Sequence, residues 1–185
     1  MTTVTQARYS GVAMILHWLI AIAVIVNWRL AENFEHAEDA DKLYWITQHK
    51  ALGITILILS VLRLLWRFTR RPPELAASLA GWERSLARAV HVIFYVMLIG
   101  LPIGGWVASS FSHYPIDFWG LFNVPLLPVA ENKELGHEIA EAHGAGATFL
   151  LLLVVLHIVG ALKHTLIDKD GNIHRMLPWG PEPKA

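Results

Sequence analysis

Four long apolar stretches constrain the fold of this chain more than any other feature. They cover about residues 11–30, 44–66, 86–109 and 143–166. Each is long enough to cross a bilayer, which takes about 20 mostly apolar residues. Backbone groups in lipid must be satisfied within a helix or a closed barrel, so spans of this length are helices. We therefore expect an all-α integral membrane four-helix bundle, with residues 1–185 forming a single transmembrane domain.

The composition agrees with a membrane protein and excludes several other classes. The chain is 55% hydrophobic and 16% charged, with a mean hydropathy of +0.44, whereas soluble domains carry about 25% charge. It has no cysteine, which excludes thiolate metal sites and cysteine-ligated iron–sulfur clusters. Its net charge of zero gives no support for a nucleic-acid partner. The high hydrophobic fraction predicts that the chain is surrounded by membrane lipid.

The distribution of basic residues predicts the orientation. The connection between the second and third spans is rich in arginine: Arg67, Arg70, Arg71, Arg84 and Arg88. The other two connections are mainly acidic. Because basic loops stay in the cytoplasm, we expect both termini to be cytoplasmic and the two acidic connections to face outward. The outer cations are then few: Arg29, Lys42, Lys50 and Lys133.

Histidines are unusually frequent within the spans. Six of the ten lie inside or at the ends of a span: His17, His49, His91, His143, His157 and His164. Ionisable side chains at membrane depth are costly and by default suggest a functional site. For any one of them alone, the alternative is a packing residue bonded to a neighbouring carbonyl.

Two pairs of histidines are expected at matched depths. His143 and His157 are fourteen residues apart, which places them about 21 Å apart along one helix and on the same side of it. His17 lies early in a span that starts inside, at the depth of His157. His49 lies early in a span that starts outside, at the depth of His143. The helices thus offer one imidazole pair in each leaflet.

Haem fits two facing imidazoles better than a bare metal ion does. Zn²⁺ takes about four ligands, and no carboxylate within a span could complete its shell. Haem brings four nitrogens of its own and needs only axial ligands, for which a bundle interior is a usual place. Glycines near the histidines would let a flat macrocycle approach, although they serve equally well as packing residues: Gly53, Gly144, Gly146 and Gly160.

Five segments, in order along nearly the whole chain, resemble the bacterial cytochrome b561 family. They are YSGVAMILHW, HKALGITILILSVLRLLWR, HVIFYVMLIGLPIGGW, HGAGATFLLLLVVLHIVGALKH and DKDGNIHRMLP. The resemblance implies a di-haem cytochrome b of the inner membrane that exchanges electrons with the quinone pool. Some members resemble a superoxide:ubiquinone oxidoreductase. The resemblance also implies iron ligands: His17 and His157 for an inner haem b, and His49 and His143 for an outer one.

Four further residues are candidates for the site. Arg63, fourteen residues after His49, falls at the inner depth and could contact a haem propionate or a quinone, or it could be an interfacial anchor. His91 is a rival inner ligand, a quinone contact or a packing residue, and the resemblance argues against the ligand role. His164 could meet a propionate or a quinone. Lys50, next to His49, could guide an anion to the outer haem.

Three functions are compatible with these sequence features. The first is a stand-alone quinone-linked oxidoreductase, in its most specific form one that oxidises superoxide outside and reduces ubiquinone. The second is a membrane-anchor cytochrome subunit that passes electrons between quinone and a periplasmic redox protein, which the acidic outer connections suit at least as well. The third is a histidine-based transporter, which lacks a polar path because Thr148 is the only polar residue between His143 and His157.

Overall fold

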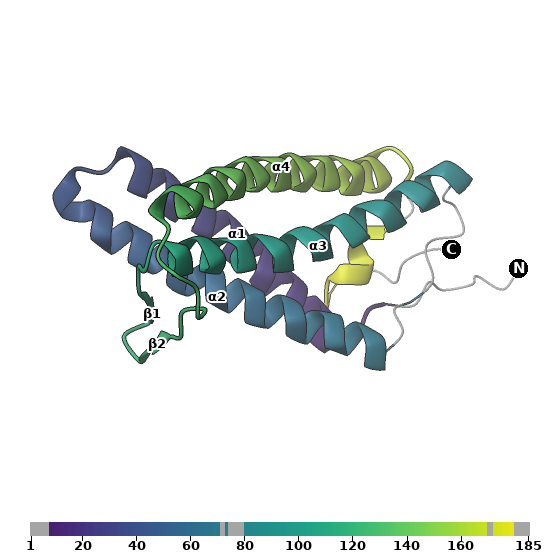
Figure 1. Cartoon of the computed structure of the whole chain (residues 1–185). Coiled ribbons are helices and arrows are strands. Elements are labelled where there is room, and N and C mark those ends of the chain that lie inside the picture. The colour runs from purple at the N-terminus through teal and green to yellow at the C-terminus, as the bar shows by residue number, and fades with distance from the viewer. Residues whose placement is uncertain (1–7, 71–72, 74–79, 170–171, 180–185) are drawn as a thin grey trace, which may run out of the picture.

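The computed structural model describes residues 8–70, 73, 80–169 and 172–179. Its four long helices are α1 (Gly11–His36), α2 (Asp39–Thr69), α3 (Gly81–Phe111) and α4 (Lys133–Leu166) (Figure 1). All four are long and apolar enough to cross a membrane. The prediction of an all-α membrane bundle with four spans is confirmed.

The helices continue beyond the apolar stretches that predicted them. Only residues 37–38 separate α1 from α2, so most of the acidic residues predicted in that connection lie on helices: Glu32, Glu35, Asp39 and Asp41. Helix α4 begins at Lys133, ten residues before the apolar stretch at residues 143–166. Hydropathy marks only the part of a helix that lies in lipid, whereas capping decides where the helix begins. Asn132 caps α4 by accepting a hydrogen bond from Leu135 N at 3.0 Å.

The helices pack as two hairpins. Helix α1 lies along α2 and α3 lies along α4, and α2 also contacts α3. A small apolar core joins them, formed by Ile20 and Val24 of α1, Ile56 of α2 and Leu150 of α4. Many other large apolar side chains are exposed along the helices, as expected for surfaces that face lipid.

The connection between α3 and α4 has secondary structure of its own. It contains an antiparallel pair of strands, β1 (Ile116–Phe118) and β2 (Phe122–Val124) (Figure 1). The turn between them uses positive φ angles at Trp119 and Gly120, 57° and 72°. Trp119 Nε1 donates a hydrogen bond to Thr55 Oγ1 on α2 at 3.0 Å, so the hairpin packs against that helix.

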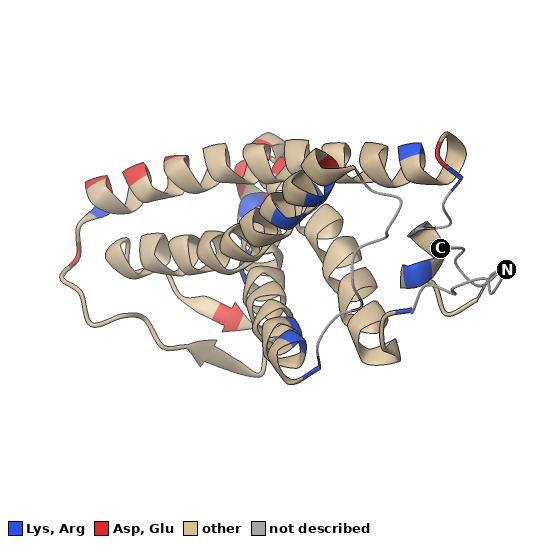
Figure 2. Ribbon diagram, turned by 90° about the vertical axis from the view of Figure 1, so that its right-hand side faces the viewer, with Lys and Arg blue, Asp and Glu red and all other residues tan. Residues whose placement is uncertain are grey.

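Both described ends of the chain meet at the opposite end of the bundle. Tyr9 N donates to Arg175 O at 3.1 Å, and Trp18 Nε1 donates to Met176 O of the 3₁₀ helix η1 (Asn172–Met176) at 2.9 Å. Arginines gather here at the ends of α2 and α3 (Figure 2). We call this the arginine-rich end, and we call the opposite end, where the β1–β2 hairpin lies, the hairpin end. That the arginine-rich end is cytoplasmic stays a prediction from the charge distribution.

Candidate functional site

His49 and His143 face each other near the hairpin end. Their ring centroids are 6.0 Å apart. The Nδ1 atom of His49 lies 3.1 Å from Asn27 O, and that of His143 lies 2.9 Å from Leu101 O. An imidazole that donates from Nδ1 to a carbonyl presents the lone pair of Nε2 to a metal, and such a bond also fixes the ring. We call these two residues the outer histidine pair.

Gly105 of α3 makes room for the ring of His143. A Cβ atom at this position would lie 3.3 Å from His143 Cε1, which is tighter than ordinary packing. The four glycines noted in the sequence differ in their surroundings, and a Cβ at Gly53 would make only an ordinary contact, 3.8 Å from Asn27 Nδ2. A Cβ at Gly146 would lie 2.7 Å from Leu101 Cδ2, so Gly146 serves helix packing, whereas Gly144 and Gly160 have nothing within 4 Å of such an atom.

Three imidazoles lie together nearer the arginine-rich end. The centroid of the His157 ring is 6.3 Å from that of His17 and 6.1 Å from that of His91. Phe94 packs edge-on against His157, with centroids 5.4 Å apart. We call the three histidines the inner histidine group. The structure thus brings together both pairs that the sequence predicted, and it places His91 as close to His157 as His17 is.

The spacing of these rings suits two axial ligands of one metal. A metal-bound imidazole nitrogen lies about 2.0–2.1 Å from the metal and about 1.1 Å from the centre of its own ring, so two opposed rings have centroids about 6 Å apart. Among the described residues, no carboxylate contacts the histidine rings at either level. Two imidazoles without further ligands match the donor set that haem requires, and they fall short of a four-coordinate zinc site.

Arg63 lies at the inner level, as its spacing from His49 predicted. Its Nη1 donates to Ala13 O of α1 at 3.1 Å, one helical turn from His17. It also lines a cavity of about 400 Å³ at the arginine-rich end. Three more arginines line this cavity, together with Tyr9 and Tyr95: Arg8, Arg67 and Arg70. The cavity is therefore cationic and carries aromatic walls.

Each of the four cations of the hairpin end has a partner, and that of Lys50 is the connection between α3 and α4. The Nζ atom of Lys50 lies 3.4 Å from Pro115 O and 5.5 Å from the centre of the Tyr114 ring, so the connection between α3 and α4 holds it in place. The other three cations have partners of their own. Lys42 pairs with Asp39 at 3.0 Å, Lys133 pairs with Glu131 at 3.3 Å, and Arg29 lies over Trp28.

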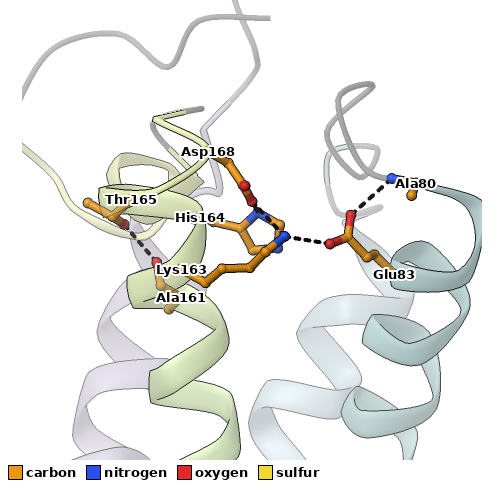
Figure 3. A network of polar contacts seen from close by, with 7 residues as sticks. All are labelled: Ala80, Glu83, Ala161, Lys163, His164, Thr165 and Asp168. Carbon is orange, nitrogen blue, oxygen red and sulfur yellow. Dashed lines mark hydrogen bonds and ion pairs between the residues drawn. The ribbon is translucent and has the colours of Figure 1, made fainter.

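His164 takes part in a network of ion pairs between α3 and α4. Lys163 Nζ lies 2.6 Å from Glu83 Oε1 and 2.9 Å from Asp168 Oδ2, and His164 Nδ1 lies 2.8 Å from the same Asp168 oxygen (Figure 3). Glu83, His164 and Asp168 are close enough to hold a metal ion. The Lys163 ammonium already lies between the two carboxylates, so the charge that an ion would supply is present.

Sequence reasoning missed the parts that position the histidines. The carbonyls of Asn27 and Leu101 and the gap at Gly105 depend on how neighbouring helices pack, which no spacing rule gives. Both acceptors are backbone carbonyls, which every residue carries, so the residue types at these positions offered no signal.

Four membrane helices with facing imidazoles at two depths define a membrane cytochrome b. The chain belongs to the prokaryotic cytochrome b561 family, whose model matches residues 8–179. It is accordingly a multi-pass protein of the bacterial inner membrane that binds haem b and transfers electrons.

Relatives from other bacteria match almost the full chain. Cytochrome b561 homolog 2 of Escherichia coli is 33% identical over 183 residues, covering 95% of this chain and 94% of the relative. Cytochrome b561 homolog 1 of the same organism is 26% identical, covering 92% and 97%. The probable superoxide oxidase CybB of Yersinia pestis is 27% identical, covering 92% and 96%.

Proposed function

We propose that this chain holds two b haems and links a donor at the hairpin end to ubiquinone at the arginine-rich end. The observation that carries the proposal is the presence of two imidazole pairs with centroids 6.0 and 6.3 Å apart. His49 and His143 would hold the outer haem, and His17 and His157 the inner one. Bound there, the haems supply one-electron transfer between the two leaflets.

The ligand set favours electron transfer over oxygen binding. Two imidazoles at each level would hold a haem iron and leave it no free coordination site for a small molecule. The carbonyls of Asn27 and Leu101 hold the outer rings in the orientation that presents Nε2. We assign His91 to the inner site as a neighbour of His157 and not as a ligand, as the family pattern implies.

The cavity at the arginine-rich end is the proposed site of the quinone head group. It has the size expected for a small-molecule site, and Arg63 both lines the cavity and donates to the Ala13 carbonyl, one helical turn from His17. A guanidinium beside a quinone oxygen would stabilise the negative charge that develops there during reduction. Arg63 is therefore the residue to which we assign a catalytic role at this end.

Superoxide is the proposed donor at the hairpin end. One relative is named a probable superoxide oxidase. Lys50 adjoins the ligand His49, and its ammonium is held by a carbonyl and a ring, so it offers a positive charge to an incoming anion. Two superoxide ions would each lose one electron and become O₂, and one ubiquinone would take up the two electrons and two protons.

An electron-transfer subunit with a cationic periplasmic redox partner is the second candidate. The observation that favours it is a row of exposed glutamates on the first turns of α4, which project at the hairpin end: Glu134, Glu138 and Glu141 (Figure 2). Such a surface would attract a positively charged protein and repel a small anion.

A ubiquinone-reduction assay with superoxide as the donor distinguishes the superoxide oxidoreductase from the electron-transfer subunit. The superoxide proposal expects ubiquinol to form at a rate that increases with the amount of protein and decreases with added salt, because salt screens an attraction. Absence of ubiquinol formation, with haem that is still reduced by a cationic redox protein, would favour the second candidate.

A further inference from the structure

Four polar side chains at the arginine-rich end form one connected unit, which we call the Lys163 cluster. Its members are Glu83, Lys163, His164 and Asp168 (Figure 3). It joins the first turn of α3 to the last turn of α4 and to the residues that follow. Glu83 Oε2 also accepts a hydrogen bond from Ala80 N at 3.0 Å, which fixes the carboxylate at the start of α3.

The charges of the other three side chains in the cluster do not balance without a proton on His164. Two carboxylates and one ammonium sum to a single negative charge, which a protonated His164 would neutralise. The hydrogen bond from Lys163 lowers the pKa of the Asp168 carboxyl, so Asp168 stays ionised at neutral pH. Imidazole is the side chain that changes charge between about pH 5 and 8. Imidazole has two ring nitrogens, one that can accept a proton and one that can donate, and His164 Nδ1 lies 2.8 Å from Asp168, so His164 is the member of the cluster with the geometry of a proton relay.

The cluster lies beyond the inner histidine group along α4, at the arginine-rich end that we expect to face the cytoplasm. His164 follows His157 by seven residues, which places it about 10 Å farther along α4 and on nearly the same side of the helix. Among the described residues of the arginine-rich end, Glu83 and Asp168 are the carboxylates. The many arginines here cannot relay protons, because guanidinium does not deprotonate in proteins.

We propose that the Lys163 cluster is the proton entry point for quinone reduction, with His164 as the group that takes a proton from water and hands it inward. The inference rests on the proposed function, because reduction of one ubiquinone consumes two electrons and two protons and forms two O–H bonds. The electrons come from the donor. His164 would deliver each proton in turn through bridging water and be reprotonated from the cytoplasm, so the cluster returns to its starting charge.

The test uses the full-length, haem-loaded protein with its haem reduced chemically and then mixed with decylubiquinone. Haem re-oxidation is followed by absorbance and proton uptake by a pH-indicator dye. We compare His164→Gln with His174→Gln, which removes a histidine of η1 outside the cluster. At pH 8 we expect His164→Gln to slow both signals about tenfold or more, as is typical for loss of a proton-transfer group. Added imidazole should restore the rate, and His174→Gln should behave as wild type.

Two results would overturn the proposal. One is re-oxidation of His164→Gln at the wild-type rate, and the other is a slow rate that imidazole does not restore, which would indicate a structural role. If His164→Gln does not load haem, Asp168→Asn is judged by the same rate and proton-uptake criteria. Wild-type haem that decylubiquinone does not re-oxidise would instead overturn the quinone-linked function, and the proton route with it.

Discussion

His49 on α2 and His143 on α4 face each other with ring planes 85° apart, and each commits its Nδ1 to a carbonyl of another helix. The carbonyl acceptors belong to α1 and α3, so all four helices take part in orienting this one pair. Such an arrangement fixes two Nε2 lone pairs before any metal binds. The predictions below follow from that arrangement and from its inner counterpart.

Two haems per polypeptide are expected. The reason is the presence of two separate levels of opposed imidazoles, one at His49 and His143 and the other at His17 and His157. A pyridine haemochrome assay on protein of known concentration measures the ratio. One haem per chain in well-folded protein would show that one of the pairs does not bind haem.

His157→Ala should remove the inner haem and leave the outer one partly occupied. Each pair lies at its own level, and the two share only α4, which carries a ligand for each. Difference spectra and haem content measure the loss. His36→Ala, at the exposed end of α1, is the control and should retain both haems. Loss of both haems in folded His157→Ala would mean that the two sites are not independent.

Gly105→Val should impair the outer haem selectively. A Cβ at Gly105 already lies 3.3 Å from the His143 ring, and two further methyl groups would displace the ring, with a typical overpacking cost of about 1–3 kcal/mol. Gly100→Val places the same side chain on α3 where nothing lies within 4 Å of the new Cβ, so it is the matched control. Equal haem content in the two variants would contradict the role of Gly105.

The sequence was sufficient for the bundle and for the histidine pairs because both depend on periodic spacing along single helices. Fourteen residues between His143 and His157 determine a depth and a side of the helix, and the structure has both rings where the spacing predicted them. The Trp119 contact with Thr55 and the close approach at Gly105 join residues far apart in the sequence. Such contacts follow from the packing of whole helices, so no local pattern contained them.

The Lys163 cluster is a second example of contacts that the sequence did not predict. Sequence reasoning placed His164 near a propionate or a quinone because of its depth alone. In the structure the Nδ1 atom of His164 lies beside Asp168, beyond the end of α4, and the Lys163–Glu83 contact crosses to α3. A contact of His164 with a propionate or a quinone stays a prediction. Ion pairs of this kind depend on side-chain direction, which depth does not supply.

Arg63→Ala should keep both haems while it lowers the midpoint potential of the inner haem and slows quinone turnover. Loss of a nearby cation favours the oxidised iron, which carries the extra positive charge. The shift should be tens of millivolts, the size expected for a partly screened unit charge. Arg29→Ala, which removes a cation from the hairpin end, is the control. An unchanged inner potential with unchanged turnover would make Arg63 an interfacial anchor.

Lys50→Glu should reduce the rate of haem reduction by superoxide by about tenfold or more, the lower range for electrostatic steering. Added salt should slow the wild-type reaction, because charges at the surface act over only about 8–10 Å at physiological ionic strength. Lys42→Glu makes the same charge change at a lysine already paired with Asp39, so a smaller effect is expected. A wild-type rate that increases with salt would show that this face is not built for an anion.

The central claim is that electrons cross the membrane through both histidine levels of one chain. Proteoliposomes that carry the oriented protein and ubiquinone, with superoxide generated only outside, test it most directly. We expect the wild type to form ubiquinol. We expect His157→Ala to form none, although the outer haem of that variant should still be reduced by superoxide. Ubiquinol formation by His157→Ala at the wild-type rate would contradict the account.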